Sequence, residues 1–117
     1  MAAPNIVNVT TITGKTAVQA VGTSATAIVT NNSGSGKVLK VNFLMLANTD
    51  GAANVDATVD LYRGSTAYKL AHTILVPADS SFDVLSAPLY LEEGDALRLT
   101  ASAAGDLDAV CSYEEIS

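Results

Sequence analysis

Two segments in the second half of the chain alternate apolar and polar residues position by position. Residues 95–101 show this pattern, and residues 54–62 show it over a full strand length, with apolar Val55, Ala57, Val59 and Leu61 between polar Asp56, Thr58 and Asp60. A period of two places alternate side chains on opposite faces of a pleated strand. The pattern predicts an antiparallel sheet with one face in a core and the other in water.

Similar short segments follow one another along the rest of the chain. Turn-forming residues separate them roughly every 8–12 residues, and no window shows a helical period. We expect a loop at 31–36 and strands near 16–20, 25–30, 37–47, 54–62, 67–76, 81–86, 89–91, 95–101 and 107–114. The chain thus contains about eight or nine expected strands, which predict an all-β protein with an antiparallel β-sandwich. A jelly roll is one form that this sandwich could take.

The N-terminal segment is β-branched and polar. Residues 5–13 contain no helix former, and Gly14-Lys15 predicts a turn after them. We therefore expect residues 1–15 to form an extended arm or an edge strand, and residues 16–117 to form a single sandwich domain. The apolar side chains of this segment are candidate contacts with a neighbouring subunit: Ile6, Val7, Val9 and Ile12.

The most apolar segment is 37–47. Strict alternation places Leu39, Val41, Phe43 and Met45 on one face, and it leaves further apolar side chains on the other face: Val38, Leu44 and Leu46. A strand that is apolar on both faces is either central or covered by a partner. We therefore take the second set as candidate contacts with a partner subunit.

Composition adds to this picture. Hydrophobic residues make up 49% of the 117, but aromatic residues only 5%, and there is no Trp. Large aromatic side chains contribute most burial per residue, so we expect a thin core that subunit contacts could supplement. The formal net charge is −6, and the six basic residues are isolated from one another. Binding to nucleic acid is not expected, because it requires a basic face.

Export and membrane insertion are not expected from the sequence. The first residues lack a basic stretch followed by an apolar one, so no signal peptide is expected, and no segment is long and apolar enough for a membrane span. We expect synthesis and folding in a cytoplasm. The single cysteine, Cys111, excludes an internal disulfide and is expected to be a small core side chain.

Candidate chemistry is sparse. Gly14-Lys15-Thr16 resembles the end of a phosphate-binding loop, but Val9 stands where that loop needs a glycine. The only histidine, His72, has no acid or nucleophile placed beside it, so we expect a structural or partly buried side chain. The acidic residues lack the spacing of a calcium loop and are expected on solvent faces and turns. No catalytic residue, metal or cofactor is predicted.

Six segments spread along the chain carry a family resemblance: 1–16, 36–42, 47–51, 76–79, 89–93 and 112–116. On these residues the chain resembles, over its whole length, a family of small virion structural proteins of tailed phages, especially marine phages of cyanobacteria. The resemblance implies a component of the phage particle and carries no catalytic residues.

Together these observations favour a capsid decoration, or cement, protein on the outer surface of a phage head. Its expected partners are the major capsid protein and further copies of itself, with a trimer preferred because gaps in icosahedral shells commonly lie on threefold axes. A subunit of the neck, tail or fibre would have a similar sequence and stays open. A carbohydrate-binding module also stays open, although its usual aromatic platform has no counterpart in the scattered aromatic residues.

Overall fold

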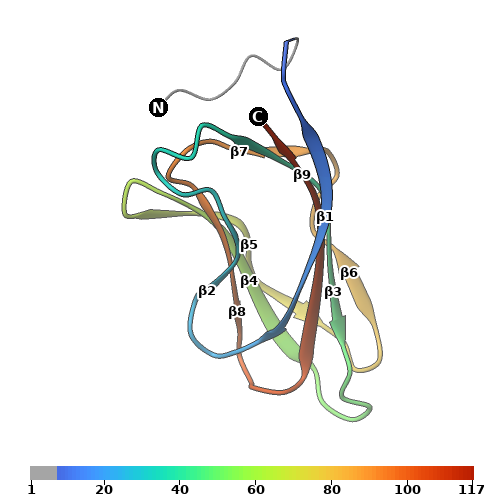
Figure 1. Ribbon diagram of the computed structural model, residues 1–117. Helices are drawn as coiled ribbons and strands as arrows, with labels where there is room; N and C mark the ends of the chain where they lie inside the picture. Colours follow the sequence, from blue (N-terminus) through green and yellow to red (C-terminus); the bar gives the residue numbers. More distant parts are fainter. Residues whose placement is uncertain (1–7) are drawn as a thin grey trace.

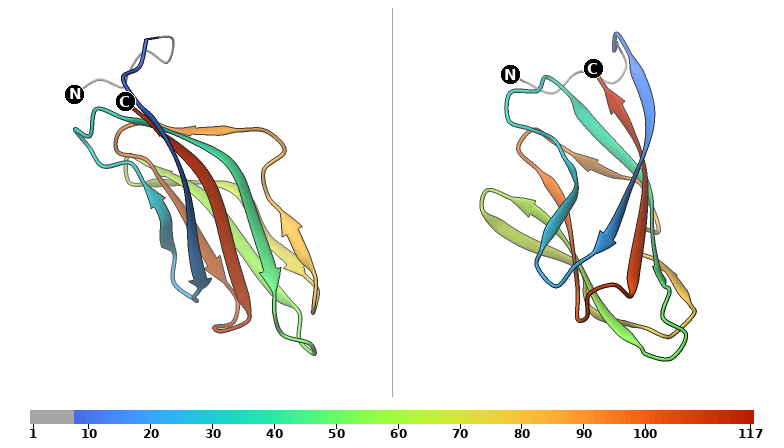
Figure 2. Two further views of the ribbon diagram at one scale, coloured as in Figure 1. Left: turned by 45° about the vertical axis from the view of Figure 1, so that its right-hand side comes forward. Right: turned by 60° about the horizontal axis from the view of Figure 1, so that its bottom comes forward.

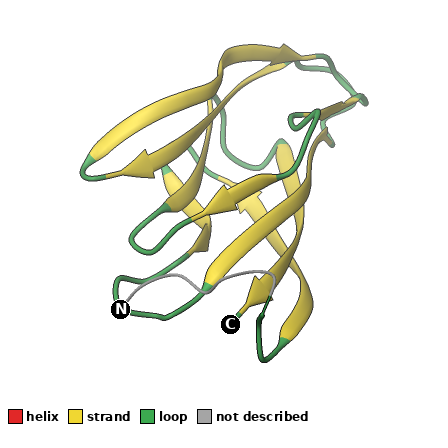
Figure 3. Cartoon of the chain, turned by 90° about the horizontal axis from the view of Figure 1, so that it is seen from above, coloured by secondary structure: helices red, strands yellow, loops and turns green. Residues whose placement is uncertain are grey.

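The computed structural model describes residues 8–117, which form nine β-strands and no helix. Figure 3 shows the described chain as strands joined by loops. The strands are β1 (Ile12–Val21), β2 (Thr26–Thr30), β3 (Val38–Asn48), β4 (Val55–Arg63), β5 (Thr66–Val76), β6 (Ser81–Asp83), β7 (Leu89–Leu91), β8 (Ala96–Ala101) and β9 (Leu107–Ile116). β5 ends directly before Pro77, as expected for a residue that cannot donate to a ladder.

The strands form two antiparallel sheets packed face to face, which confirms the predicted β-sandwich (Figure 1). The first sheet has the order β1-β9-β3-β6, and β7 also pairs with β3. The second sheet has the order β2-β8-β4-β5. The left view of Figure 2 shows β1 (blue), β9 (red) and β3 (green) side by side. β1 is therefore an edge strand of the first sheet among the described residues.

The core between the sheets is built from small and medium apolar side chains. Its buried members are Val21, Val29, Leu39, Val41, Leu44, Leu46, Val55, Ala57, Val59, Ala71, Val76, Leu91, Leu97, Leu99, Ala101, Leu107, Ala109 and Cys111. Phe82 and Tyr113 are only partly buried against this cluster. The low aromatic content of the sequence therefore corresponds to a core of Val, Leu and Ala.

A β-bulge in the middle of β3 reverses the strand's alternation. Val41 pairs with Tyr113 and Phe43 with Ser112, so Asn42 is an extra residue without a partner on β9. A bulge of one residue exchanges the faces of every side chain that follows it. Leu44 and Leu46 consequently lie in the core, and both are fully buried.

The expectations for the two faces of β3 are therefore partly wrong. Leu44 and Leu46 are core residues and are not accessible to a partner. Phe43 and Met45 were expected on the same face as Leu39 and Val41, but they do not share that face. The register places Met45 opposite Val110 and Phe43 opposite Ser112, on the outer face of the sheet. Val38 is also buried, beside its ladder partner Ile116.

The first strand begins earlier than the sequence suggested. β1 starts at Ile12 and pairs with β9 without interruption through ten positions. The turn expected at Gly14-Lys15 is wrong, because Gly14 pairs with Glu114 and Lys15 with Tyr113 within this ladder. Residues 12–15 thus belong to an edge strand of the sandwich. The remainder of the expected arm, residues 1–7, lies outside the described residues.

Two buried asparagines fix the loops that join the sheets. Asn31 donates from its side-chain amide to the carbonyl oxygens of Lys37 (2.9 Å) and Leu91 (3.0 Å), and it accepts a hydrogen bond from Ser35 Oγ (2.6 Å). Its backbone N–H also donates to the Asp95 carbonyl at 2.9 Å. Buried amides need such partners, since an unpaired polar group is costly away from water.

Asn48, at the end of β3, has the same role in a second loop region. Its side-chain amide donates to the carbonyl oxygens of Ala53 and Val76, both at 2.9 Å, and its side-chain oxygen accepts from Asp50 N–H at 3.0 Å. These bonds join the end of β3 to the loop before β4 and to the end of β5. The loops are thereby attached to the two sheets.

We predict that Leu44→Ala and Met45→Ala differ strongly in their effect on stability. Leu44→Ala removes a fully buried side chain and should lower the free energy of unfolding by about 2–5 kcal/mol. Met45→Ala truncates a half-exposed side chain on the outer face and should cost well under half as much. Denaturant unfolding measures both values. The reverse order would show that β3 alternates without the bulge at Asn42.

Candidate interaction surface

The structure separates the residues that the sequence suggested as subunit contacts. Ile6 and Val7 lie outside the described residues. Val9 is half-buried, whereas Ile12 remains exposed at the start of β1, with 57% of its surface accessible. Because Val38, Leu44 and Leu46 are buried, the accessible part of the predicted contact set is confined to the N-terminal side of the chain.

A different group of apolar side chains lies on the outer face of the first sheet. Val18 on β1 pairs with Val110 on β9, and Val110 pairs in turn with Met45 on β3. Directly opposed residues share a face, so these side chains form a row across three strands, and Phe43 lies in the adjacent row. We call Val18, Val110, Met45 and Phe43 the outer band. Val18 is 74% exposed and Val110 38% exposed.

The outer band was not identified from the sequence. Val110 occupies the polar face of the alternating segment that begins at Leu107, between Asp108 and Ser112. A β-branched apolar residue among polar ones on that face is the signal that could have revealed it. Phe43 and Met45 could not be assigned without the bulge at Asn42.

A shallow hollow lies beside the outer band, over the neighbouring strands β1 and β9. It has a volume of about 340 Å³ and is lined by Val18, Gln19, Ala20, Asp108, Ala109 and Val110. One carboxylate and no basic group line this surface. The hollow therefore offers mainly apolar contact next to the accessible edge of β1.

A buried carboxylate on the second sheet, Asp60, is paired with basic side chains. Asp60 is buried although it lies on the outer face, so the expectation that it faces water is wrong. Arg98 donates from Nε to Asp60 Oδ1 at 2.9 Å, and Lys69 Nζ lies 3.8 Å from Oδ2. The Arg98 guanidinium also lies 3.9 Å from the centroid of the Tyr62 ring. These long side chains cover the carboxylate with their apolar stems.

A second buried carboxylate is held by Arg63 at the end of β4. Arg63 donates to both oxygens of Asp95, at 2.8 and 2.6 Å, and also to Glu92 at 2.9 Å. Asp95 further accepts a hydrogen bond from the Glu92 backbone N–H at 2.8 Å. The bonds from Arg63 lower the pKa of Asp95 below its ordinary value of 3.8. Asp95 is therefore a structural group and not a proton donor at neutral pH.

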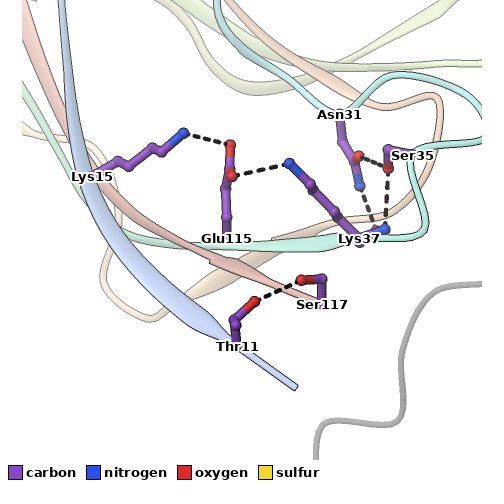
Figure 4. Close-up of polar contacts among 7 residues, drawn as sticks. All are labelled: Thr11, Lys15, Asn31, Ser35, Lys37, Glu115 and Ser117. Carbon is purple, nitrogen blue, oxygen red and sulfur yellow. Dashed lines mark hydrogen bonds and ion pairs between the residues drawn. The ribbon is translucent and has the colours of Figure 1, made fainter. Parts of the chain in front are cut away.

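A third ion-pair group joins β1, β9 and the loop before β3 (Figure 4). Lys15 Nζ lies 3.1 Å from one oxygen of Glu115, and Lys37 Nζ lies 3.2 Å from the other. The hydrogen bond from Lys15 lowers the pKa of Glu115 and raises that of Lys15. Thr11 and Ser117 are hydrogen-bonded beside this group at 2.9 Å. Such exposed ion pairs each contribute little to the free energy of unfolding. Here, however, they pair Lys15, which is the only charged residue of β1.

The other candidate groups do not form a chemical site. His72 is exposed on β5, so partial burial, one of the two alternatives expected for it, is wrong. Together with Thr73 it stands where β5 has more residues than β4. Cys111 is fully buried as predicted, and burial raises the pKa of its thiol to about 11. Within residues 8–117, no three His, Cys, Asp or Glu side chains are grouped so that they could hold a metal ion. Nor does that part of the chain contain a helix suited to crossing a bilayer.

Comparisons with known proteins identify similar folds but no family. No family model and no curated protein matches the chain. A solved structure from Bacillus endospore appendages, described as disulfide-linked pili, is 18% identical and covers 100% of this chain and 96% of its own, with a TM-score of 0.55. At this identity the likeness bears on the fold alone, and it agrees with the sandwich described above.

Two pentameric capsid proteins from metagenomic phage sequences are more distant in structure. They are 24% and 21% identical, with TM-scores of 0.40 and 0.42, and the matches cover 86% and 98% of this chain. This chain spans only 64% and 65% of their lengths. TM-scores this low carry no argument about fold or function.

We predict that Asp95→Asn lowers stability at pH 7 and removes part of its acid dependence. Because the folded pKa of Asp95 is lowered, its contribution is complete above about pH 4 and disappears as the pH falls through the folded pKa. The substitution should cost about 1–3 kcal/mol at pH 7 and progressively less as the pH falls through the folded pKa. Thermal unfolding between pH 2 and 7 measures this. Asp108→Asn, which removes an exposed charge, is the control, and an equal effect in both variants would contradict the prediction.

We also predict that the thiol of Cys111 is unreactive in the native protein. A buried thiol with a pKa of about 11 is almost entirely protonated at pH 8, and the thiolate is the reactive form. A colourimetric disulfide reagent should therefore react far more slowly with the native protein than with free cysteine, and at the same rate after denaturation. Rapid native labelling would mean that Cys111 is accessible.

Proposed function

We propose that this chain is a non-enzymatic structural subunit of a phage virion, a decoration protein that binds the outer surface of the head. The observation that carries the proposal is the outer band, a group of apolar side chains on the outer face of β3, β9 and β1 that is most exposed at the edge strand β1. Exposed apolar groups of this kind mark interaction surfaces. The resemblance to small virion proteins of tailed phages supports the particle as the place of that interaction.

The arrangement of the other groups supports a structural role over catalysis. Among residues 8–117, the buried aspartates are neutralised by arginines, the histidine is exposed, and the thiol is buried. A general base or nucleophile needs an orienting partner within hydrogen-bond reach. The ion pairs instead stabilise the sheets.

We further propose that the subunit assembles with copies of itself, preferentially as a trimer, and that the major capsid protein is its partner on the head. The strand order, in which the chain passes repeatedly from one sheet to the other, supports a jelly roll. The similar spore appendage protein forms disulfide-linked pili. In this chain Cys111 is buried, so contacts between copies would be noncovalent.

Two alternative functions are distinguished from this proposal in different ways, the first by its copy number in virions and the second by the positions of the aromatic side chains. A subunit of the neck, tail or fibre would also need an interaction surface, and it differs in copy number. A carbohydrate-binding module would need clustered aromatic side chains. The exposed Tyr68 and Tyr90 lie on β5 and β7, in different sheets, which disfavours it.

Quantitative mass spectrometry of purified virions tests the proposal. We expect a copy number of the same order as that of the major capsid protein, because decoration proteins repeat with the shell. A single ring of copies per particle would support a neck or tail subunit instead. Absence of the chain from virions would overturn the proposal altogether.

A further inference from the structure

The accessible edges of the two sheets differ in how they are protected against strand addition. An edge strand presents unpaired N–H and C=O groups, and proteins protect such edges with short strands, bulges or charges. β6 and β7 have three residues each, and β2 has five with a register shift at Ile28. Three of these edge strands are therefore short, and one is also irregular.

β5 has eleven residues and β1 has ten, but β5 is strongly irregular. Its ladder with β4 shifts twice, leaving Leu70 and the pair His72-Thr73 out of regular register. Thr73 has a φ of 48°, a left-handed conformation that β-branched residues rarely adopt. A second chain could not form a regular ladder along this edge.

Among the described strands, only β1 lacks each of these protections. Its ten residues pair with β9 in one continuous register, without a bulge. Its one charge, Lys15, is engaged by Glu115. Most of its residues are exposed, including Val18 at the end of the outer band. β1 is thus a long, regular edge that is suitable for an added strand.

We infer that β1 accepts residues 1–7 of a second copy of this chain as an additional strand. The inference rests on the proposed self-assembly and names the contact through which it occurs. An added strand forms backbone hydrogen bonds along the edge, while its alternate side chains contact the surface beside it. The hollow at Val18 and Ala20 lies next to this edge and can accept an apolar side chain.

The sequence of the segment is suited to this role. Residues 1–7 carry no charged side chain, and they end in the β-branched pair Ile6-Val7. Fully extended, seven residues span at most about 25 Å, whereas the ten residues of β1 span about 33 Å. The segment can therefore pair within the length of β1.

The hydrogen bonds of the residues directly before β1 favour a neighbouring copy over the segment's own β1. Thr10 and Thr11 both donate from their backbone N–H to the Ser117 carbonyl, at 2.7 and 2.9 Å. Ser117 follows β9, which lies on the side of β1 opposite to the accessible edge. The chain thus enters β1 from the β9 side, away from the edge that it would have to reach in its own subunit.

Contacts of this kind are head-to-tail, because the segment of one copy meets a different surface of the next. Such contacts close into a ring when the rotation between copies allows it. Three copies related by a threefold axis would each donate one segment and accept one. This arrangement is consistent with the proposed trimer.

Light scattering on the full chain and three variants tests the inference. Val18→Lys places a charge on the outer face at the proposed acceptor, and Leu75→Lys is the matched control on β5, where the residue is 56% exposed. The third variant begins at Asn8. We expect the full chain and Leu75→Lys to have three times the 12.0 kDa monomer mass, and the other two variants to be monomers.

A direct binding measurement complements the masses. A fluorescent peptide of residues 1–7 should bind the variant that begins at Asn8, and several-fold more weakly when that variant also carries Val18→Lys. Thermal unfolding shows whether each variant is folded. If Val18→Lys is not folded, Thr16→Lys, at another exposed position of β1, replaces it.

Three results would overturn the inference: a monomeric full chain, an oligomer that survives removal of residues 1–7, or peptide binding that Val18→Lys does not change. A filament that requires residues 1–7 and Val18 would support strand addition. None of these results alters the copy number in virions, so failure here is distinguishable from failure of the proposed function.

Discussion

The one-residue bulge at Asn42 is the constraint on which the first sheet depends. β3 is the strand of that sheet that pairs with β9, β6 and β7, and its apolar residues do not follow a single period of two. The bulge allows Val41 before it and Leu44 after it to point into the same core. Without it, the second half of β3 would bury Phe43 and Met45 and expose two leucines.

The same bulge creates the candidate interaction surface. By turning Phe43 and Met45 outward, it places them beside Val110 and Val18 on the outer face. The core loses its larger side chains in this exchange and consists of Val, Leu, Ala and one Cys. Core and surface are thus determined together, which is why a thin core and an apolar outer band occur in the same molecule.

The second sheet depends on the pairing of a buried charge. Its outer face carries Asp60, Arg98 and Tyr62, and the carboxylate is removed from water by the side chains that pair with it. Removing one member of a buried pair leaves an unpaired charge, which is much more costly than the pair itself is stabilising. This sheet also has the irregular edge β5, whereas the first sheet has the regular edge β1. The surfaces suited to association are therefore concentrated on the first sheet.

The sequence by itself determined the all-β class, most strand positions, the loop at 31–36 and the burial of Cys111, because periodicity and turn residues act locally. It could not determine the faces of β3, the burial of Asp60, or the start of β1 at Ile12. A bulge is a mismatch between two paired strands, so no pattern within one strand specifies it. Burial of Asp60 likewise depends on Arg98, 38 residues away in the chain, and β1 extends to Ile12 because β9 is long enough to pair with it. Only tertiary pairing decides such features.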